Sequence, residues 1–303
     1  MSVLGIHPPR PRRSFTLIEL LITISVVTIL AATIVVAMAG AIEQARVERA
    51  RAQVLKINEL LIRRWEEYRT RPVRIRIPQG ISGRHAAWLR LNALRELMRM
   101  EMPDRISDVA DPPVSLPAVP SLNLAYQRRA SAGWNTTHES AECLYLILAL
   151  MREGDGTALD NFKPSEIADV DGDGMKEIID PWGVPIYFLR WAPQLQTPLQ
   201  DPNNRANAPD PFDPFRVGIS DINSDQPNWA MYPFVFSAGP DETHGYDVAT
   251  GFQYSTTGST PPTLTPTFIP MSWPNNPYMP GNTAGALLPG GAWRDDIHSH
   301  LLE

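Results

Sequence analysis

An uninterrupted apolar segment near the start of the chain constrains this sequence more than any other feature. Residues 20–42 contain no charged side chain and no proline. At about 1.5 Å per residue, a helix of this length spans roughly 34 Å, which is enough to cross a lipid bilayer. Three arginines precede the segment and an acidic body follows it. The positive-inside rule therefore predicts a single-pass protein with a cytoplasmic leader and a C-terminal part outside the cytoplasm.

The helical pattern is expected to continue beyond the membrane. Apolar residues recur at spacings of three and four, which is typical of a helix with one buried face. These residues are Ala50, Val54, Ile57, Leu61, Trp65 and Tyr68. The helix should end at Arg71-Pro72, because a residue before proline avoids helical geometry. We therefore expect a transmembrane helix over residues 15–42, an amphipathic continuation over 43–71 and a globular domain over 72–303.

Proline and cysteine contents limit what the globular domain can be. The chain has 30 prolines, of which 17 fall from Pro193 onward, so this half should consist of long loops and short strands. The single cysteine, Cys143, excludes an internal disulfide, a cysteine-cluster zinc site and a CxxC redox motif.

Local patterns predict the elements of this domain. Helices are expected over residues 86–102 and 140–152, short strands over 73–77, 185–191 and 229–237, and a proline-rich linker over 103–120. The fold class is therefore α+β, with the long N-terminal helix packed on an antiparallel β-sheet domain that carries extra helices and long loops.

Charge is divided unevenly along the chain. Residues 41–105 carry 15 basic and 8 acidic side chains, whereas residues 106–303 carry 9 basic and 24 acidic ones. An acidic body argues against nucleic acid as a partner. We hypothesise that the basic arginines after the apolar segment meet the acidic bodies of adjacent copies; they are Arg46, Arg49, Arg51, Arg63 and Arg64.

Glu19 is the anomaly at the start of the apolar segment, since inserting a carboxylate there costs a few kcal/mol. The string RRSFTLIELL, residues 12–21, resembles the leader junction of type IV prepilins and of type II secretion pseudopilins. By that resemblance, prepilin peptidase removes the leader, residues 1–14, by cutting between Ser14 and Phe15, and N-methylates Phe15. Glu19 would then pair with the Phe15 amine of a neighbouring copy in a filament core.

Two other interpretations of this N-terminus remain open. Ala37-Met38-Ala39 fits the small-residue rule of an ordinary secretory cleavage site, which would make Gly40 the first mature residue. An uncleaved signal anchor is also compatible with the pattern. The resemblance to prepilins implies a pilin-like lollipop fold, in which the long helix carries the globular domain.

An acidic loop over residues 169–180 predicts a metal site. Its carboxylates follow the spacing of a twelve-residue calcium loop, with glycine at the sharp turn and a backbone carbonyl from Met175. The predicted ligands are Asp169, Asp171, Asp173, Met175, Glu177 and Asp180. Because the last ligand is short, we expect weak structural Ca²⁺ binding, around 10⁻⁴–10⁻³ M. The alternative is a metal-free Asp-Gly turn.

Two later segments resemble the major pseudopilin of type II secretion. They are Asp180-Pro181-Trp182-Gly183 and the loop that begins at Ser237 and contains Gly239 and Asp241. The resemblance implies a second, weaker calcium site at Ser237, Asp241 and Asp247. It does not extend over residues 73–135 or 192–230, which look like insertions.

Together these features predict a structural protein and not an enzyme, because no catalytic motif is present. The resemblance implies a pseudopilin of the bacterial inner membrane, with its C-terminal domain in the periplasm, that is extracted into a periplasmic filament. Its expected partners are copies of itself, other pseudopilins, prepilin peptidase, the inner-membrane secretion platform and the lipid bilayer. The alternatives are a type IV pilin or minor pilin for adhesion or DNA uptake, and a membrane-anchored calcium-binding envelope protein.

Overall fold

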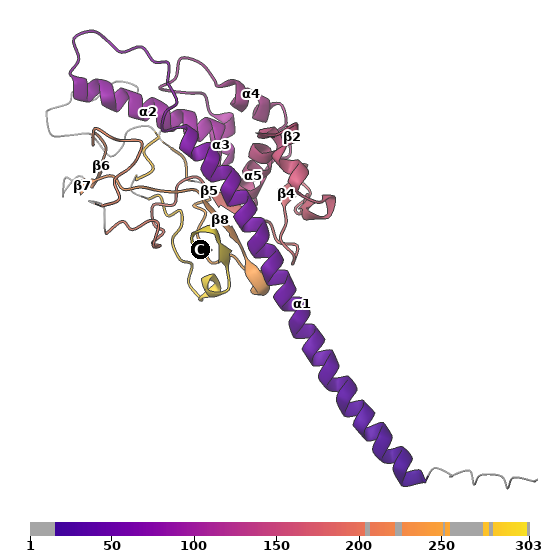
Figure 1. The fold of residues 1–303 in the computed structure, drawn as a ribbon. Helices are drawn as coiled ribbons and strands as arrows, with labels where there is room; N and C mark the ends of the chain where they lie inside the picture. The colour runs from indigo at the N-terminus through magenta and orange to yellow at the C-terminus, as the bar shows by residue number, and fades with distance from the viewer. Residues whose placement is uncertain are drawn as a thin grey trace, which may run out of the picture. The chain divides into compact units, whose positions relative to one another are not determined.

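The structure is a computed structural model that describes residues 16–203, 207–221, 226–250, 252–254, 275–278 and 281–301. The chain divides into two compact units, residues 1–45 and residues 46–303. A single helix, α1 (Leu17–Glu67), begins in the first unit and ends in the second (Figure 1).

In the first unit, α1 is apolar and exposed. Large aliphatic side chains from Leu17 to Ile42 are mostly more than half exposed. By length and composition this helix could cross a membrane. The hydroxyls inside the apolar stretch donate to carbonyls three or four residues earlier, at 2.8–2.9 Å, as expected for a helix in an apolar environment; they belong to Thr23, Ser25, Thr28 and Thr33.

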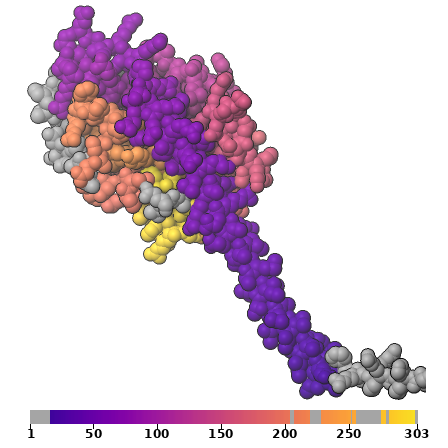
Figure 2. All heavy atoms as spheres, viewed as in Figure 1, coloured from indigo at the N-terminus to yellow at the C-terminus, as the bar shows by residue number. Residues whose placement is uncertain are grey.

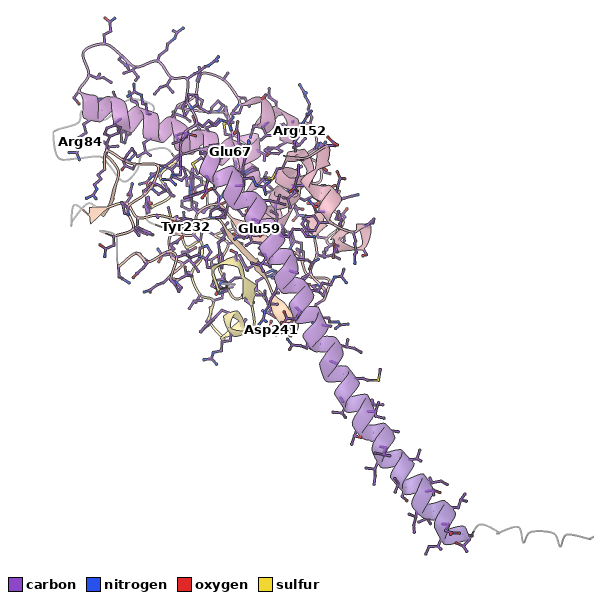
Figure 3. The ribbon with its side chains drawn as sticks, viewed as in Figure 1. Glu59, Glu67, Arg84, Arg152, Tyr232 and Asp241 are labelled. Atoms are coloured by element: carbon purple, nitrogen blue, oxygen red, sulfur yellow. The ribbon has the colours of Figure 1, made fainter. Side chains whose placement is uncertain are left out.

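In the second unit, α1 is amphipathic, as the sequence predicts. Ala50, Val54, Ile57 and Leu61 are fully buried. The opposite face carries charged side chains such as Glu59 (Figure 3). In the space-filling view this part of α1 lies on the surface of the unit, between segments from later in the chain (Figure 2). The helix ends at Glu67, before the predicted Arg71, and continues only as a hydrogen-bonded turn.

Within the described ranges, four shorter α-helices follow: α2 (Gly83–Glu101), α3 (Ile106–Ala110), α4 (Ser121–Gln127) and α5 (Glu139–Leu150). The predictions of α2 and α5 are confirmed to within a few residues. Ser82 caps α2 by accepting a hydrogen bond from the backbone N–H of His85 at 3.2 Å. The predicted linker over 103–120 is wrong in part, because it contains α3.

The predicted strand over residues 73–77 is also wrong. The alternation of half-buried and exposed residues is present, with Val73 packed against the core and Arg74 exposed. In the described chain, however, this extended segment belongs to no β-ladder. Alternating apolar and polar residues show only that one side of an extended segment is buried. A β-strand also needs a neighbouring strand with which it forms hydrogen bonds.

All described sheets are small and antiparallel. The largest has the strand order β5 (Tyr187–Leu189), β8 (Phe234–Ser237) and β9 (Ile297–His298), with Phe188 opposite Val235 and Phe236 opposite His298. The other ladders pair β1 (Arg152–Glu153) with β2 (Gly156–Thr157), β3 (Ile167–Ala168) with β4 (Glu177–Ile178), and β6 (Ile219–Asp221) with β7 (Gln226–Pro227). Short 3₁₀ turns lie at Ala158–Asn161, Pro164–Glu166, Gly239–Asp241, Ala292–Arg294 and Ser299–Leu301.

The core of the second unit forms around α5, which packs against β4 and β5. This helix is buried nearly all round, as its apolar sequence predicts. Cys143 is a buried free thiol within it. The predicted α+β fold class, with a long N-terminal helix, antiparallel sheets and extra helices, is confirmed.

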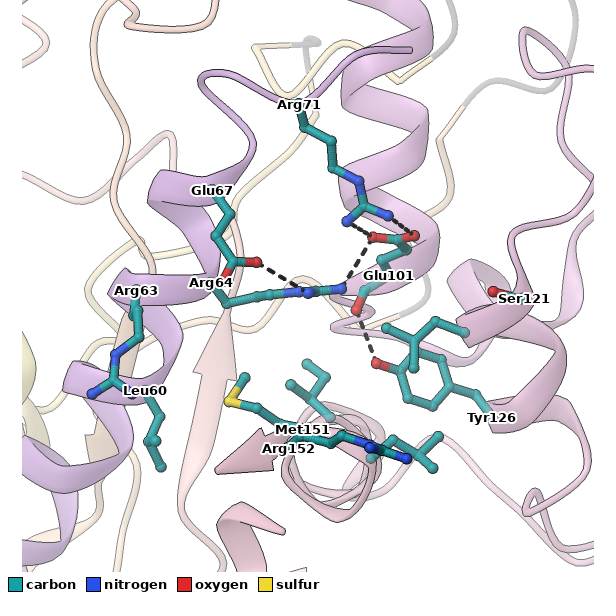
Figure 4. Close-up of a pocket in the computed structure, with 13 residues that line it drawn as sticks. Leu60, Arg63, Arg64, Glu67, Arg71, Glu101, Ser121, Tyr126, Met151 and Arg152 are labelled. Atoms are coloured by element: carbon teal, nitrogen blue, oxygen red, sulfur yellow. Dashed lines mark hydrogen bonds and ion pairs between the residues drawn. The ribbon is translucent and has the colours of Figure 1, made fainter. Parts of the chain in front are cut away.

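A buried carboxylate, Glu101, fixes the end of α1 to α2 (Figure 4). Its side chain is 4% exposed and accepts hydrogen bonds from Arg64 at 3.2 Å and from Tyr68 at 2.8 Å. Arg71 bonds both carboxylate oxygens, at 2.5 and 2.7 Å. Two cations and a hydroxyl therefore compensate one buried negative charge.

Replacing Glu101 by alanine should lower the free energy of unfolding by about 2–4 kcal/mol, because Arg71 and the buried hydroxyl of Tyr68 lose their acceptor. The measurement is denaturant unfolding of the full-length chain in detergent, with tryptophan fluorescence as the signal. Glu67 is the control: it pairs with the same Arg64 at 3.1 Å but is 55% exposed, so Glu67→Ala should cost about 0.5 kcal/mol or less. Equal losses from the two variants would contradict this account.

Candidate processing site and cation-binding loop

The first turn of α1 is closed by a capping box. The backbone N–H and the hydroxyl of Thr16 both donate to Oε2 of Glu19 at 2.9 Å, and the N–H of Glu19 donates to Oγ1 of Thr16 at 3.3 Å. Glu19 is exposed. The predicted cleavage residues Ser14 and Phe15 lie outside the described residues.

The capping box gives Glu19 a role that the sequence analysis missed. Thr16-Leu17-Ile18-Glu19 has the S/T-x-x-E spacing of this motif, and a carboxylate at a helix N-terminus is also stabilised by the helix dipole. Glu19 therefore has partners within its own chain. Its presence at the edge of the apolar segment does not by itself require a neighbour's amine.

The acidic loop connects β3 to β4 and folds as a series of aspartate-backbone turns. Asp169 accepts from the N–H groups of Gly172 at 2.8 Å and Gly174 at 3.1 Å, and Asp173 accepts from that of Met175 at 2.8 Å. Both glycines have positive φ, 78° and 90°. These turns bring oxygens of Asp169, Asp171 and Asp173 within 4.8 Å of one another.

A second group of carboxylates shares Asp171 with the first. Oxygens of Glu142, Asp171 and Glu177 also lie within 4.8 Å of one another. Glu142 comes from the first turn of α5 and was not predicted, whereas Glu177 begins β4. Glu142 and Glu177 are each fully buried, and Asp171 is exposed.

In each buried glutamate, only one of the two carboxylate oxygens accepts a hydrogen bond from the described residues. Oε2 of Glu142 accepts a hydrogen bond from the indole N–H of Trp134, and Oε2 of Glu177 accepts one from the N–H of Val170 at 3.0 Å. Among the described residues, Oε1 of Glu142 and Oε1 of Glu177 have no hydrogen-bond partner. Burial and the neighbouring carboxylates raise the pKa of Glu142 to about 8 and that of Glu177 to about 7.

One predicted ligand of the loop, Asp180, has other partners in the structure. Oδ1 of Asp180 accepts from the N–H groups of Trp182 at 2.9 Å and Val184 at 3.0 Å, and Oδ2 accepts from Ser237. In the described chain, Asp180 therefore caps the turn at Pro181 and does not join the close carboxylate groups. The side chain of Met175 is buried, and its sulfur faces the N–H of Ser131 at 3.2 Å.

The bond between Asp180 and Ser237 joins the two segments that resemble the major pseudopilin. Oγ of Ser237 lies 2.7 Å from Oδ2 of Asp180 and accepts from the N–H of Gly239 at 3.2 Å. The other second-site candidates are used in local turns, since Asp241 accepts from Thr243 and Asp247 from Ala249. Within the described ranges, neither aspartate belongs to a close group of three or more potential ligands.

The arginines that the sequence assigns to contacts between copies are largely paired within the chain. Arg49 bonds Glu166 at 2.8 Å, Arg51 bonds Glu48 at 3.0 Å, and Arg63 lies 3.8 Å from Glu153. Arg63 and Arg64 also line a pocket of about 430 Å³ with Tyr126 and Arg152 (Figure 4). Less positive charge is therefore left for a neighbouring acidic body than the sequence suggests.

One comparison with known proteins identifies the N-terminal signal. Residues 9–35 match the family described as the prokaryotic N-terminal methylation motif. No curated protein and no solved structure gave a match. The chain thus carries a type IV pilin-like prepilin signal, which indicates a methylated prepilin-peptidase substrate, and its N-terminal apolar helix is compatible with membrane anchoring.

Replacing Ser237 by alanine should lower the free energy of unfolding by about 1–3 kcal/mol, because the buried carboxylate of Asp180 loses a donor. Thermal and denaturant unfolding of the full-length chain measure the change. The control Thr243→Ala removes an exposed hydroxyl from the following loop and should change stability by less than about 0.5 kcal/mol. If Ser237→Ala is as mild as the control, the bond does not hold these segments together.

Proposed function

We propose that this chain is a structural pseudopilin of a type II secretion system. The observation that carries the proposal is the methylation motif over residues 9–35, placed at the start of a 51-residue helix whose first half is apolar and exposed. In this proposal, prepilin peptidase cuts between Ser14 and Phe15 and methylates Phe15. The protein waits in the inner membrane with its globular unit in the periplasm, and the secretion platform adds it to a periplasmic filament.

Helix packing supplies the shape of such a filament but little net hydrophobic driving force. Lipid tails are as apolar as the side chains of α1, so transfer from bilayer to filament core gains mainly van der Waals contacts. A charge pair between the new amine of Phe15 and Glu19 of a neighbour would add directionality in a low-dielectric core. In that state Glu19 serves both its own helix cap and the neighbour's amine.

Two features favour secretion over a type IV pilin or minor pilin. The chain has one cysteine, Cys143, which is buried in α5, so no disulfide staples its C-terminal part. The turn at Asp180 is instead fixed to β8 through Ser237, and both segments resemble the major pseudopilin. A pilin for adhesion or DNA uptake is the second candidate, because the methylation motif is common to both classes.

The mature N-terminus tests processing. Co-expression with prepilin peptidase should yield a chain that begins at N-methylated Phe15, as measured by intact mass and by sequencing of the terminal peptide. An unprocessed chain, or one that begins at Gly40, would contradict the proposal.

Substitutions at the capping box separate the two roles of Glu19. Glu19→Gln keeps a capping side chain but removes the charge, whereas Thr16→Ala removes the cap and keeps the charge. We expect both variants to be processed, Glu19→Gln to be lost from filaments, and Thr16→Ala to be incorporated. Cross-linking and filament pull-down measure incorporation. Normal incorporation of Glu19→Gln would contradict the charge pair, and loss of Thr16→Ala from filaments would show that assembly needs the cap.

Deleting the gene for this chain distinguishes the two classes of filament. A pseudopilin deletion should abolish export of secreted proteins and leave surface pili intact, as measured by the secreted protein profile and electron microscopy. Loss of pili with normal export would support the pilin alternative.

A further inference from the structure

The contact between α5 and the acidic loop contains more negative charge than the protein itself compensates. Five carboxylates meet there, from Glu142, Asp169, Asp171, Asp173 and Glu177. In the described part of the chain, none of them forms an ion pair with arginine or lysine. Other buried carboxylates in this unit do have cationic partners, since Glu101 and Asp108 each form ion pairs with arginines.

Apart from Asp171, which both groups share, the carboxylates divide into two kinds. Oxygens of Asp169 and Asp173 hold the backbone N–H groups of the turn, so these residues are explained by loop folding alone. Glu142 and Glu177 are not explained in this way, because each has a buried oxygen without a donor and also contributes a carboxylate oxygen to the group that contains Asp171. A buried acceptor that lacks a partner costs about 1–3 kcal/mol, and more if it is charged.

We propose that Glu142, Asp171 and Glu177 hold a divalent cation, Ca²⁺, that links helix α5 to the β3–β4 loop. The donor set consists of carboxylate oxygens only, which suits a hard cation and disfavours zinc or copper. Ca²⁺ accepts irregular sets of six to eight oxygens, whereas Mg²⁺ needs near-octahedral geometry. This site differs from the calcium loop that the sequence predicts, since it uses Glu142 and does not use Asp180.

Neighbouring contacts hold the same parts together and show what the cation would stabilise. Asn135 donates to Asp171 at 2.9 Å and to Asp173 at 3.1 Å, and Ser131 donates to the carbonyl of Asp173 at 2.8 Å. The segment before α5 is thus already fastened to the loop. A cation bound by Glu142 would also link the buried helix α5 to the loop. The free energy of cation binding should therefore add to the stability of the globular unit.

Cation binding by the full-length protein in detergent is the first test. We expect the melting temperature to rise with CaCl₂ relative to chelator, and calorimetry to give a Kd around 10⁻⁴–10⁻³ M. A melting temperature that does not depend on Ca²⁺, with no calorimetric binding, would overturn the proposal and leave a metal-free acidic turn.

Glu142→Gln is the decisive variant, because it replaces a carboxylate ligand by an amide that cannot ionise. We expect its Kd for Ca²⁺ to rise at least about tenfold. In chelator it should melt at or above the wild-type temperature, since the neutral amide can donate a hydrogen bond to a neighbouring carboxylate oxygen that lacks a donor. Simple damage to packing would lower the melting temperature in both conditions. Glu59→Gln, the same change at an exposed position on α1, is the matched control and should alter neither value.

Asp180→Asn separates this site from the twelve-residue loop. Because Asp180 bonds Ser237 in the structure, we expect the variant to bind Ca²⁺ with wild-type affinity even if it is less stable. Loss of affinity in Asp180→Asn together with unchanged affinity in Glu142→Gln would overturn the proposal in favour of the loop alone. Asp171→Asn, at an exposed position, should lose affinity without a folding defect.

Trp134 offers a local optical readout, because its indole N–H bonds Glu142. Tb³⁺ should bind at the calcium site and emit when tryptophan is excited. Emission should disappear in Trp134→Phe while calorimetric Tb³⁺ binding persists. Emission that survives in Trp134→Phe and in Glu142→Gln would place the cation elsewhere. None of these outcomes depends on N-terminal processing, so the cation site and the proposed function can fail separately.

Discussion

Among the residues that the structure describes, the apolar half of α1 has no packing partner within its own unit. Its aliphatic side chains are exposed from Leu17 to Ile42, and even its hydroxyl groups are turned back onto the helix backbone. Only lipid or other apolar helices can cover such a surface, since water penalises each exposed aliphatic side chain. The methylation motif at residues 9–35 overlaps the start of this helix and indicates a prepilin-peptidase substrate.

Predictions from sequence succeeded where the structure depends on neighbours close in the chain. The spacing of Ala50, Val54 and Ile57 gave the buried face of α1, because one helix face is set by local periodicity. The strand predicted over 73–77 failed because a strand depends on a partner that alternation cannot reveal. Helix α3 has only five residues and is held by contacts from elsewhere, such as the bond from Asn123 to the carbonyl of Asp108.

In the acidic loop, too, contacts between residues close in the chain could be predicted from sequence, and contacts between distant residues could not. Asp169, Asp171 and Asp173 lie together as their spacing predicts, because turns between them are local. Asp180 was assigned to this loop, but Ser237, 57 residues later, and the turn at Pro181 occupy its carboxylate. Glu142 could not be found from spacing, since it comes from another element and lies in a helix that reads as apolar core.

Glu19 is anomalous in the sequence and Glu142 in the structure, but the two carboxylates differ in how much they need a charge partner. Glu19 is exposed and accepts hydrogen bonds from Thr16, so its charge is tolerated before any assembly. Glu142 is buried beside other carboxylates with one oxygen unpartnered, so its ionised form is costly unless a cation is bound. The argument for a charge partner is therefore stronger at Glu142. At Glu19 the case for a neighbour's amine depends on the methylation motif, not on burial.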